Sequence, residues 1–99
     1  MPYRLTKRAA ADLLEIAAYT ARQWGDAQAV KYRSFFNEAF QRIGDDPQTA
    51  GSRARDGLLA GCRILTVEQH IVVYRRREGT TEILRILHQR MNLPLQRLL

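Results

Sequence analysis

The sequence contains very little cysteine and histidine, and these shortages exclude several classes of protein. Cys62 is the single cysteine, so the chain has no internal disulfide, and we expect a cytoplasmic protein in which this thiol is a small buried group. Two histidines and one cysteine, without HxxxH or CxxC spacing, supply at most a partial set of metal ligands. We therefore expect neither a metal nor a cofactor.

Long apolar runs and glycine-rich phosphate loops are missing as well. No run approaches the ~18–20 residues of a membrane span, and the first residues lack the apolar stretch of a signal peptide, so we expect no membrane association. Gly51, Gly57 and Gly61 are too widely spaced for a phosphate loop, and they precede a predicted strand rather than a helix. Ser34 and Ser52 lie in no nucleophile elbow, so catalysis by a serine nucleophile has no support.

Arginine is abundant, and its charge lies mainly in the second half of the chain. Residues 51–99 carry nine arginines and four acidic residues, a net charge of +5, whereas residues 1–50 carry seven basic and six acidic residues, a net charge of +1. Arg63, the run Arg75-Arg76-Arg77, and Arg85 fall in segments with the pattern of β-strands. A sheet that displays guanidinium groups predicts an anionic partner: nucleic acid, a machine that handles nucleic acid, or an acidic protein.

Some of these arginines also have a structural interpretation. The side chains of the run Arg75-Arg76-Arg77 alternate in direction, and such a run can be a solvated strand edge that limits aggregation; this interpretation and contact with a partner both stay open. Arg85 interrupts an apolar run. A charge in mid-strand is costly unless it is paired or lies on a wet functional face, and for Arg85 we favour the functional face.

Hydrophobic periodicity predicts one α+β domain over residues 1–99, with the element order β-α-α-β-β-β. Thr6 is the expected N-cap of the first helix, Gly25 its end, and Asp26 the cap of a second helix that stops at residues 44–47. The short connection makes the helices an antiparallel hairpin, packed on one face of a mostly antiparallel sheet. The expected strands are Tyr3–Leu5, Cys62–Glu68, His70–Arg77 and Thr81–His88, with a loop over residues 44–61 and an apolar C-terminal tail over residues 92–99 that could dock on the core or on a partner.

The two histidines are predicted to lie close together on neighbouring strands. A two-residue turn at Glu78-Gly79 places His70 opposite Leu87, and a three-residue turn places it opposite His88. Two imidazoles beside arginines could transfer protons at an RNA phosphate. They could equally hydrogen-bond the backbone at the strand ends, and we favour this second interpretation because no carboxylate is clearly placed to orient either ring.

Two aromatic residues near the end of the first helix, Tyr19 and Trp24, also leave two interpretations open. We favour burial in the core of the helix hairpin. The alternative is an exposed aromatic anchor that inserts into a partner, because aromatic side chains dominate the energetics of many interfaces.

A series of motifs runs through nearly the whole chain. It consists of Arg4-Leu5-Thr6, Ala10-x-Asp12-Leu13-x-x-Ile16-x-x-Tyr19, Trp24-Gly25, Ala29-x-x-Tyr32, Pro47, Gly61-x-Arg63, His70-x-x-Val73-Tyr74 and Ile86-Leu87-His88-x-Arg90-Met91. In their order and spacing, these motifs resemble the ParE branch of the ParE/RelE toxins of bacterial type II toxin–antitoxin systems. The resemblance covers about residues 3–92.

The resemblance implies a binding protein rather than an enzyme. ParE-like toxins are small basic proteins with a helix hairpin on an antiparallel sheet, and a cognate ParD-like antitoxin holds them inactive in a hetero-oligomeric complex. That antitoxin carries a ribbon-helix-helix DNA-binding domain and a flexible C-terminal tail that wraps the toxin, and we expect it to be acidic. The freed toxin is expected to inhibit DNA gyrase and so to block replication.

The resemblance and the charge pattern together suggest two sets of contact residues. For the target we expect Arg63, Arg75, Arg85, His88, Arg90 and Met91. For the antitoxin we expect the apolar helix surface around Tyr19, Trp24 and Phe36 with the neighbouring strand edge, because a disordered tail that folds on binding suits such a groove.

Two alternatives stay open at this stage. The RelE branch shares the fold and cleaves mRNA on the ribosome, and in this chain such an endoribonuclease would draw on His88, Arg85, Arg63 and Tyr74. The chain departs from the lysine-based RelE active site, because its two lysines fall in the predicted helices. The other alternative is a basic nucleic-acid binder that needs no protein partner, for which binding would depend steeply on salt.

Overall fold

The computed structural model describes residues 3–99, and the first two residues of the expected domain lie outside the described residues. The elements follow the predicted order, with one additional short strand, β2, inside the expected loop. They are β1 (Tyr3–Leu5), α1 (Lys7–Trp24), α2 (Asp26–Asp45), β2 (Arg53–Ala54), β3 (Cys62–Val67), β4 (His70–Arg77), β5 (Thr80–His88) and the 3₁₀ helix η1 (Leu93–Leu95).

The five strands form one sheet in the order β1-β5-β4-β3-β2. Neighbouring strands are antiparallel except that β1 runs parallel to β5, so the predicted α+β fold with a mostly antiparallel sheet is confirmed. The parallel pair joins the first and last strands of the chain. It therefore brings the beginning of α1 beside β5, where the site described below is formed.

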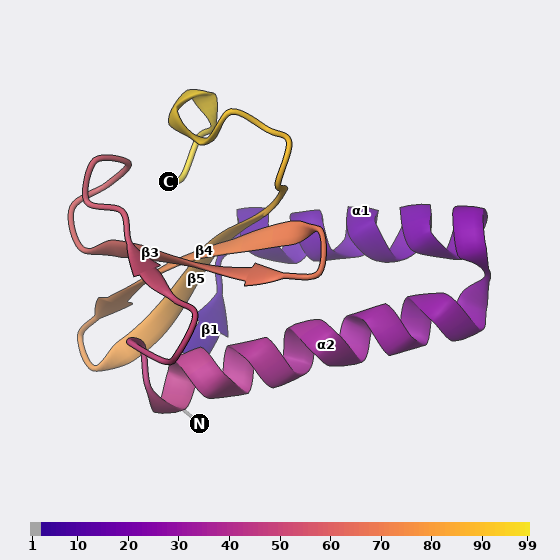
Figure 1. The fold of residues 1–99 in the computed structure, drawn as a ribbon, viewed down its shortest axis with the longest axis horizontal. Coiled ribbons are helices and arrows are strands. Elements are labelled where there is room, and N and C mark those ends of the chain that lie inside the picture. Colours follow the sequence, from indigo (N-terminus) through magenta and orange to yellow (C-terminus); the bar gives the residue numbers. More distant parts are fainter. Residues whose placement is uncertain (1–2) are drawn as a thin grey trace.

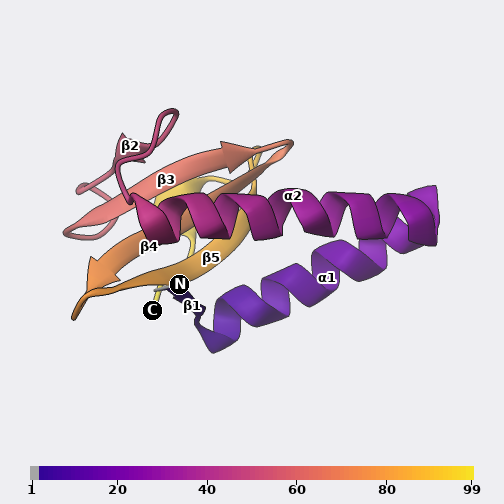
Figure 2. The ribbon, with the colours of Figure 1, turned by 90° about the horizontal axis from the view of Figure 1, so that it is seen from below.

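The two helices form the predicted hairpin, and its ends follow local sequence signals. The Thr6 hydroxyl accepts a hydrogen bond from the backbone N–H of Ala9 at 3.1 Å, as expected of an N-cap. Gly25 connects the helices with a φ of 92°, in the region that glycine adopts without strain. Asp26 is the first residue of α2 and does not cap it; Gly25 occupies the cap position, which corrects the prediction. Figures 1 and 2 show α2 across one face of the sheet and the tip of the hairpin extending beyond the strands.

Each face of the sheet carries its own apolar cluster. Along β4, Val72 and Tyr74 belong to the cluster that packs under the helices, whereas Ile71 and Val73 belong to the cluster on the opposite face. Cys62 lies in the second cluster and is fully buried, so the buried thiol is confirmed. Burial raises the pKa of this thiol, which favours its neutral form.

The C-terminal tail covers the sheet face that the helices leave open. Leu93 and Leu98 are buried in the second cluster, whereas Leu95 and Leu99 are exposed. In Figures 1 and 2 the tail lies on the side of the sheet away from α2. Two of the four leucines in the tail therefore dock on the core, and the other two do not.

The register between β4 and β5 contains an irregularity that places the histidines. Glu78 and Gly79, both with positive φ, form a two-residue turn that joins Arg77 to Thr80. A β-bulge between Val73 and Tyr74 in the pairing then shifts the register by one residue on β5. As a result His70 pairs with His88, and the partner predicted from a two-residue turn, Leu87, was wrong because the bulge adds a residue.

Candidate functional site

Of the five arginines expected on a displayed cationic surface, three are engaged in separate internal contacts: Arg63, Arg75 and Arg85. The Arg63 guanidinium donates to the carbonyl of Pro47 at 3.0 Å and to the hydroxyl of Ser52 at 2.9 Å. Arg75 and Arg85 are each bonded to a carboxylate. The expectation that the sheet displays these guanidinium groups together is therefore wrong, and target contact by any one of them stays a prediction.

Glu82 is the carboxylate that holds two of the arginines. Its side-chain oxygens accept from Arg75 at 2.9 Å and from Arg4 at 2.7 Å, which links three adjacent strands. Burial alone would raise the pKa of Glu82, but the hydrogen bonds from Arg75 and Arg4 outweigh it and lower the pKa. Arg76 and Arg77 are exposed instead, as in the solvated-edge interpretation of the arginine run.

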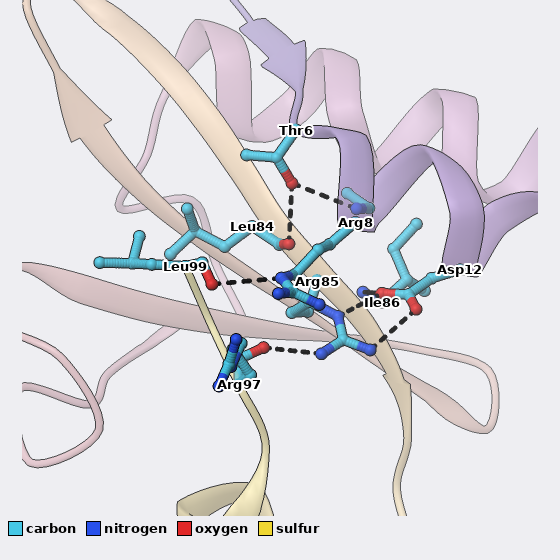
Figure 3. A network of polar contacts seen from close by, with 9 residues as sticks. Thr6, Arg8, Asp12, Leu84, Arg85, Ile86, Arg97 and Leu99 are labelled. Atoms are coloured by element: carbon cyan, nitrogen blue, oxygen red, sulfur yellow. Dashed lines mark hydrogen bonds and ion pairs between the residues drawn. The ribbon is translucent and has the colours of Figure 1, made fainter.

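Arg85 forms a two-point ion pair with Asp12 of α1 (Figure 3). The Asp12 carboxylate accepts from Arg85 Nε at 2.7 Å, from Arg85 Nη2 at 2.9 Å and from the backbone N–H of Ile86 at 3.0 Å. The hydrogen bond to Asp12 raises the pKa of Arg85, and the opposing effect of burial is smaller. Arg85 also donates to the carbonyl of Arg97 at 2.6 Å, so one side chain links α1, β5 and the tail. The charge in mid-strand thus has an internal partner.

A groove of about 330 Å³ lies between α1 and β5, and we call it the α1–β5 groove. It brings together four residues that the sequence singled out, Tyr19, Arg85, His88 and Met91, with His70 beside them. A second cavity, also of about 330 Å³, adjoins it through Thr20 and is lined by Trp24. The lining of the α1–β5 groove is Asp12, Glu15, Ile16, Tyr19 and Thr20 from α1, Arg85, Ile86, Leu87 and His88 from β5, and His70 and Met91.

Two aromatic rings, those of Tyr32 and Phe36, and two hydrogen bonds hold the histidine pair in place. The Tyr32 hydroxyl lies 2.8 Å from Nδ1 of His70, and the centroids of the two imidazoles are 5.3 Å apart. The backbone N–H of Arg90 donates to Nδ1 of His88 at 3.1 Å, as the backbone-bonding interpretation expected. Burial, and to a smaller degree His88, lower the pKa of His70 to about 4, so this ring is neutral at physiological pH.

The half-buried, neutral state of His70 predicts a loss of stability in mild acid. An unfolded histidine takes up a proton near pH 6.5, whereas folded His70 does so only near its lowered pKa of about 4. The unfolded state therefore binds more protons between these two values, and the free energy of unfolding should fall as the pH falls through this window. Urea unfolding at pH 7, 6, 5 and 4.5 measures the fall, which should be smaller in His70→Gln. Parallel curves for the two proteins would contradict the assignment.

The aromatic residues of the hairpin depart from the favoured prediction. Tyr19 is 56% exposed and Trp24 72% exposed, so the interpretation that placed them in the core is wrong. Phe36 is fully buried, because it lies on the side of α2 that faces the sheet and packs against Tyr32 and Phe40. The expectation that Phe36 contributes to an antitoxin surface is therefore also wrong.

Comparison with known proteins decides which family this architecture represents. A family model described as the ParE toxin of the type II toxin–antitoxin system parDE matches residues 3–93. This chain belongs to the ParE toxin family. It is 38% identical to Toxin ParE1 of Caulobacter vibrioides over 92% of both chains. It is also 37% identical to Toxin ParE1 of Mycobacterium tuberculosis over 91% of both, and 35% identical to Toxin ParE of Escherichia coli over 92% of this chain and 87% of that one.

A solved structure supports the same fold for this ParE toxin. A chain from the chromosomal ParDE toxin–antitoxin system of P. aeruginosa matches 89% of this chain and 95% of its own length, with a TM-score of 0.74 and 28% identity. The comparisons favour the ParE branch and give no support to the RelE alternative. Within residues 3–99 no helix is long and apolar enough to cross a membrane, and no three metal-ligating side chains are grouped as a metal site.

The residues considered for an endoribonuclease site lie in two separate places in this ParE toxin. Tyr74 is fully buried and donates its hydroxyl proton to the carbonyl of Pro47, the same carbonyl that accepts from Arg63. Arg63 and Tyr74 line a different cavity, of about 470 Å³, from the groove that holds Arg85 and His88. The four side chains therefore do not form one catalytic cluster.

Proposed function

We propose that this ParE toxin is held inactive by an acidic antitoxin that occupies the α1–β5 groove, and that the freed toxin inhibits DNA gyrase. The observation that supports the antitoxin site is the coincidence of an open groove with exposed aromatic side chains. Tyr19 lines this groove, and Trp24 lines the adjoining cavity. Exposed aromatic residues beside a groove are typical anchors for a partner segment, and a net charge of +6 favours an acidic one.

Inhibition by direct masking follows from the composition of the groove. His88 and Met91, which we expected at the target interface, line the same groove as Tyr19. An antitoxin segment seated there covers them and crowds the exposed Arg90 between them. We therefore propose His88, Arg90 and Met91 as the accessible part of the target surface.

The other three residues expected at the target are less available. Arg63, Arg75 and Arg85 would each have to give up internal hydrogen bonds before they could bind a target. Our proposal therefore assigns them first to the fold. Target contact by these three would require exchange of an internal partner for an external one.

The proposed partner has the features that the resemblance implies. We propose a ParD-like antitoxin with a ribbon-helix-helix domain and a disordered C-terminal segment that folds on the toxin, in a cytoplasmic hetero-oligomer. In this proposal the toxin acts by binding and breaks no covalent bond itself. Ordering such a segment costs conformational entropy, which burial of apolar side chains against the groove offsets.

Expression of the toxin without its antitoxin tests the proposed target. We expect arrested growth and, with purified toxin, gyrase and plasmid DNA, an accumulation of cleaved gyrase–DNA complexes. Co-expression of the antitoxin encoded beside the toxin is the control and should restore growth. Normal growth, or growth arrest without cleaved complexes, contradicts gyrase inhibition. Primer-extension mapping in the same cells should show intact transcripts, because codon-specific cuts would indicate a RelE-type endoribonuclease instead.

A further inference from the structure

The hydrogen bonds around the two histidines fix where their ring protons lie. Nδ1 of His88 accepts from the backbone N–H of Arg90, so in the neutral ring the proton is on Nε2. The Tyr32 hydroxyl oxygen accepts from the backbone N–H of Gln69 at 3.4 Å, and Nδ1 of His70, at 2.8 Å, is the acceptor that the described residues offer to the hydroxyl proton, so we assign the hydroxyl as the donor. His70 therefore also carries its proton on Nε2. Both rings have an N–H group on the side away from their internal partners.

These two N–H groups are accessible and have no acceptor within the described part of the chain. No hydrogen bond among residues 3–99 engages Nε2 of either ring, and no buried side-chain nitrogen or oxygen there lacks a partner. Both Nε2 atoms therefore reach solvent. Both residues line the α1–β5 groove, with ring centroids 5.3 Å apart and ring planes at 78°, so two donors from neighbouring rings lie at one end of it.

Both acidic side chains that line the groove interact with Arg85. Both oxygens of Asp12 are bonded to Arg85, and one of them also accepts from the N–H of Ile86. Glu15 lies close enough to Arg85 to add, after the larger effect of Asp12, to the rise of its pKa. The remaining lining residues of the groove carry no carboxylate, and the exposed Arg90 follows His88 in the chain. The histidine end of the groove therefore has donors and no carboxylate in its own lining, and Glu68 lines the adjoining cavity beside Tyr32.

We propose that the Nε2–H groups of His70 and His88 bind a carboxylate, the side chain of an aspartate or glutamate in the antitoxin segment. A carboxylate has two oxygens that accept hydrogen bonds and suits two adjacent donors. Apolar groups of the same segment would pack against the groove walls formed by Ile16, Tyr19 and Met91. This inference rests on the proposed antitoxin site and adds the chemistry of one contact within it.

A pair of variants at His88 tests the contact. His88→Gln keeps an N–H donor near the position of Nε2, whereas His88→Leu keeps a similar volume without a donor. We expect His88→Leu to weaken binding of the antitoxin encoded beside the toxin at least tenfold by calorimetry, and His88→Gln to stay within threefold of the natural toxin. His70→Gln and His70→Leu provide the same comparison if one His88 variant fails to fold, as judged by circular dichroism.

Amide variants of the antitoxin identify the acceptor. Each aspartate and glutamate of its C-terminal segment is changed to asparagine or glutamine, and one change should weaken binding tenfold with the natural toxin and have no further effect with His88→Leu. The inference is overturned if His88→Leu binds within twofold of the natural toxin, or if Gln and Leu weaken binding equally. It is also overturned if every amide variant binds normally, because the acceptor is then a backbone carbonyl. A natural toxin that does not bind the antitoxin at all contradicts the proposed function itself.

Discussion

Replacement of Asp12 by alanine should lower the free energy of unfolding by about 3–5 kcal/mol, the usual cost of breaking a buried ion pair from one side. The side chains of Asp12 and Arg85 are only 11% and 15% exposed, so water cannot replace the lost carboxylate well. The change also leaves the N–H of the buried Ile86 without its acceptor. For a domain of this size we expect a fall in Tm of about 12 °C or more, measured by circular dichroism or calorimetry.

Two further variants separate the ion pair from other effects of the substitution. Glu15→Ala, at an exposed position on the same helix, should change stability by no more than about 0.5 kcal/mol. Asp12→Ala combined with Arg85→Met should be more stable than Asp12→Ala alone, because the uncompensated cation is removed while the N–H of Ile86 stays unpaired. A Tm of Asp12→Ala within 3 °C of the natural protein would show that the pair contributes little.

The sequence predicted those parts of the fold that depend on local patterns. The helices, the three longer strands, the Thr6 cap and the Glu78-Gly79 turn follow from periodicity, capping and turn chemistry within short windows. Strand β2 has only two residues, too few for any periodic pattern. The parallel pairing of β1 with β5 and the bulge opposite Val73 depend on contacts between distant segments.

The β-bulge could not be predicted from the sequence, for a specific physical reason. Strand β5 is buried on both faces, with Ile83 and Ile86 in the helix-side cluster and Leu84 and Leu87 in the opposite one. A strand buried on both faces reads as a nearly continuous apolar run, so an extra residue does not break any alternation. Hydrophobic alternation alone could therefore not decide that His70 pairs with His88.

The sequence predicted several of the residues that line the site, but it did not predict how they are arranged. Trp24 continues the apolar stripe of α1, but it lies at the end of the helix, and the hairpin tip extends beyond the sheet that would cover it (Figure 1). Phe36 belongs to the apolar cluster between the helices and the sheet, so the same kind of stripe leads to full burial there. The partner of Arg85 was missed because Asp12 lies 73 residues earlier in the chain. Its position four residues before Ile16, on the same side of the helix, was the available signal.

The hydrogen bonds around the α1–β5 groove bear on the proposed binding of the antitoxin. Asp12 and Arg85 join α1 to β5 beside the groove, and Arg8 and Arg85 hold the tail through the carbonyls of Leu99 and Arg97 (Figure 3). A framework bonded in this way keeps the groove in one shape before a partner arrives. A preformed groove lowers the entropic cost that remains for a flexible antitoxin segment, which then has to order only itself.

Removal of both exposed aromatic side chains, in Tyr19→Ala with Trp24→Ala, should weaken antitoxin binding by about 4 kcal/mol, or about a thousandfold. Each aromatic ring is exposed and lines one of the two adjoining cavities, so each is placed to act as an interface anchor. The affinity is measured by calorimetry or by surface plasmon resonance. The double variant should also escape neutralisation when it is co-expressed with the antitoxin, provided that it remains toxic.

The helix hairpin also offers a matched control. Leu14 and Val30 are 69% and 71% exposed and line none of the described cavities, so Leu14→Ala with Val30→Ala removes a comparable exposed apolar surface elsewhere. Because neither pair of residues is in the core, both double variants should unfold within a few degrees of the natural toxin. We expect the control pair to bind antitoxin within about threefold of the natural toxin. Equal losses of antitoxin affinity for the two pairs would mean that binding depends on the general hydrophobicity of the helices. That result would contradict the α1–β5 groove as the antitoxin site.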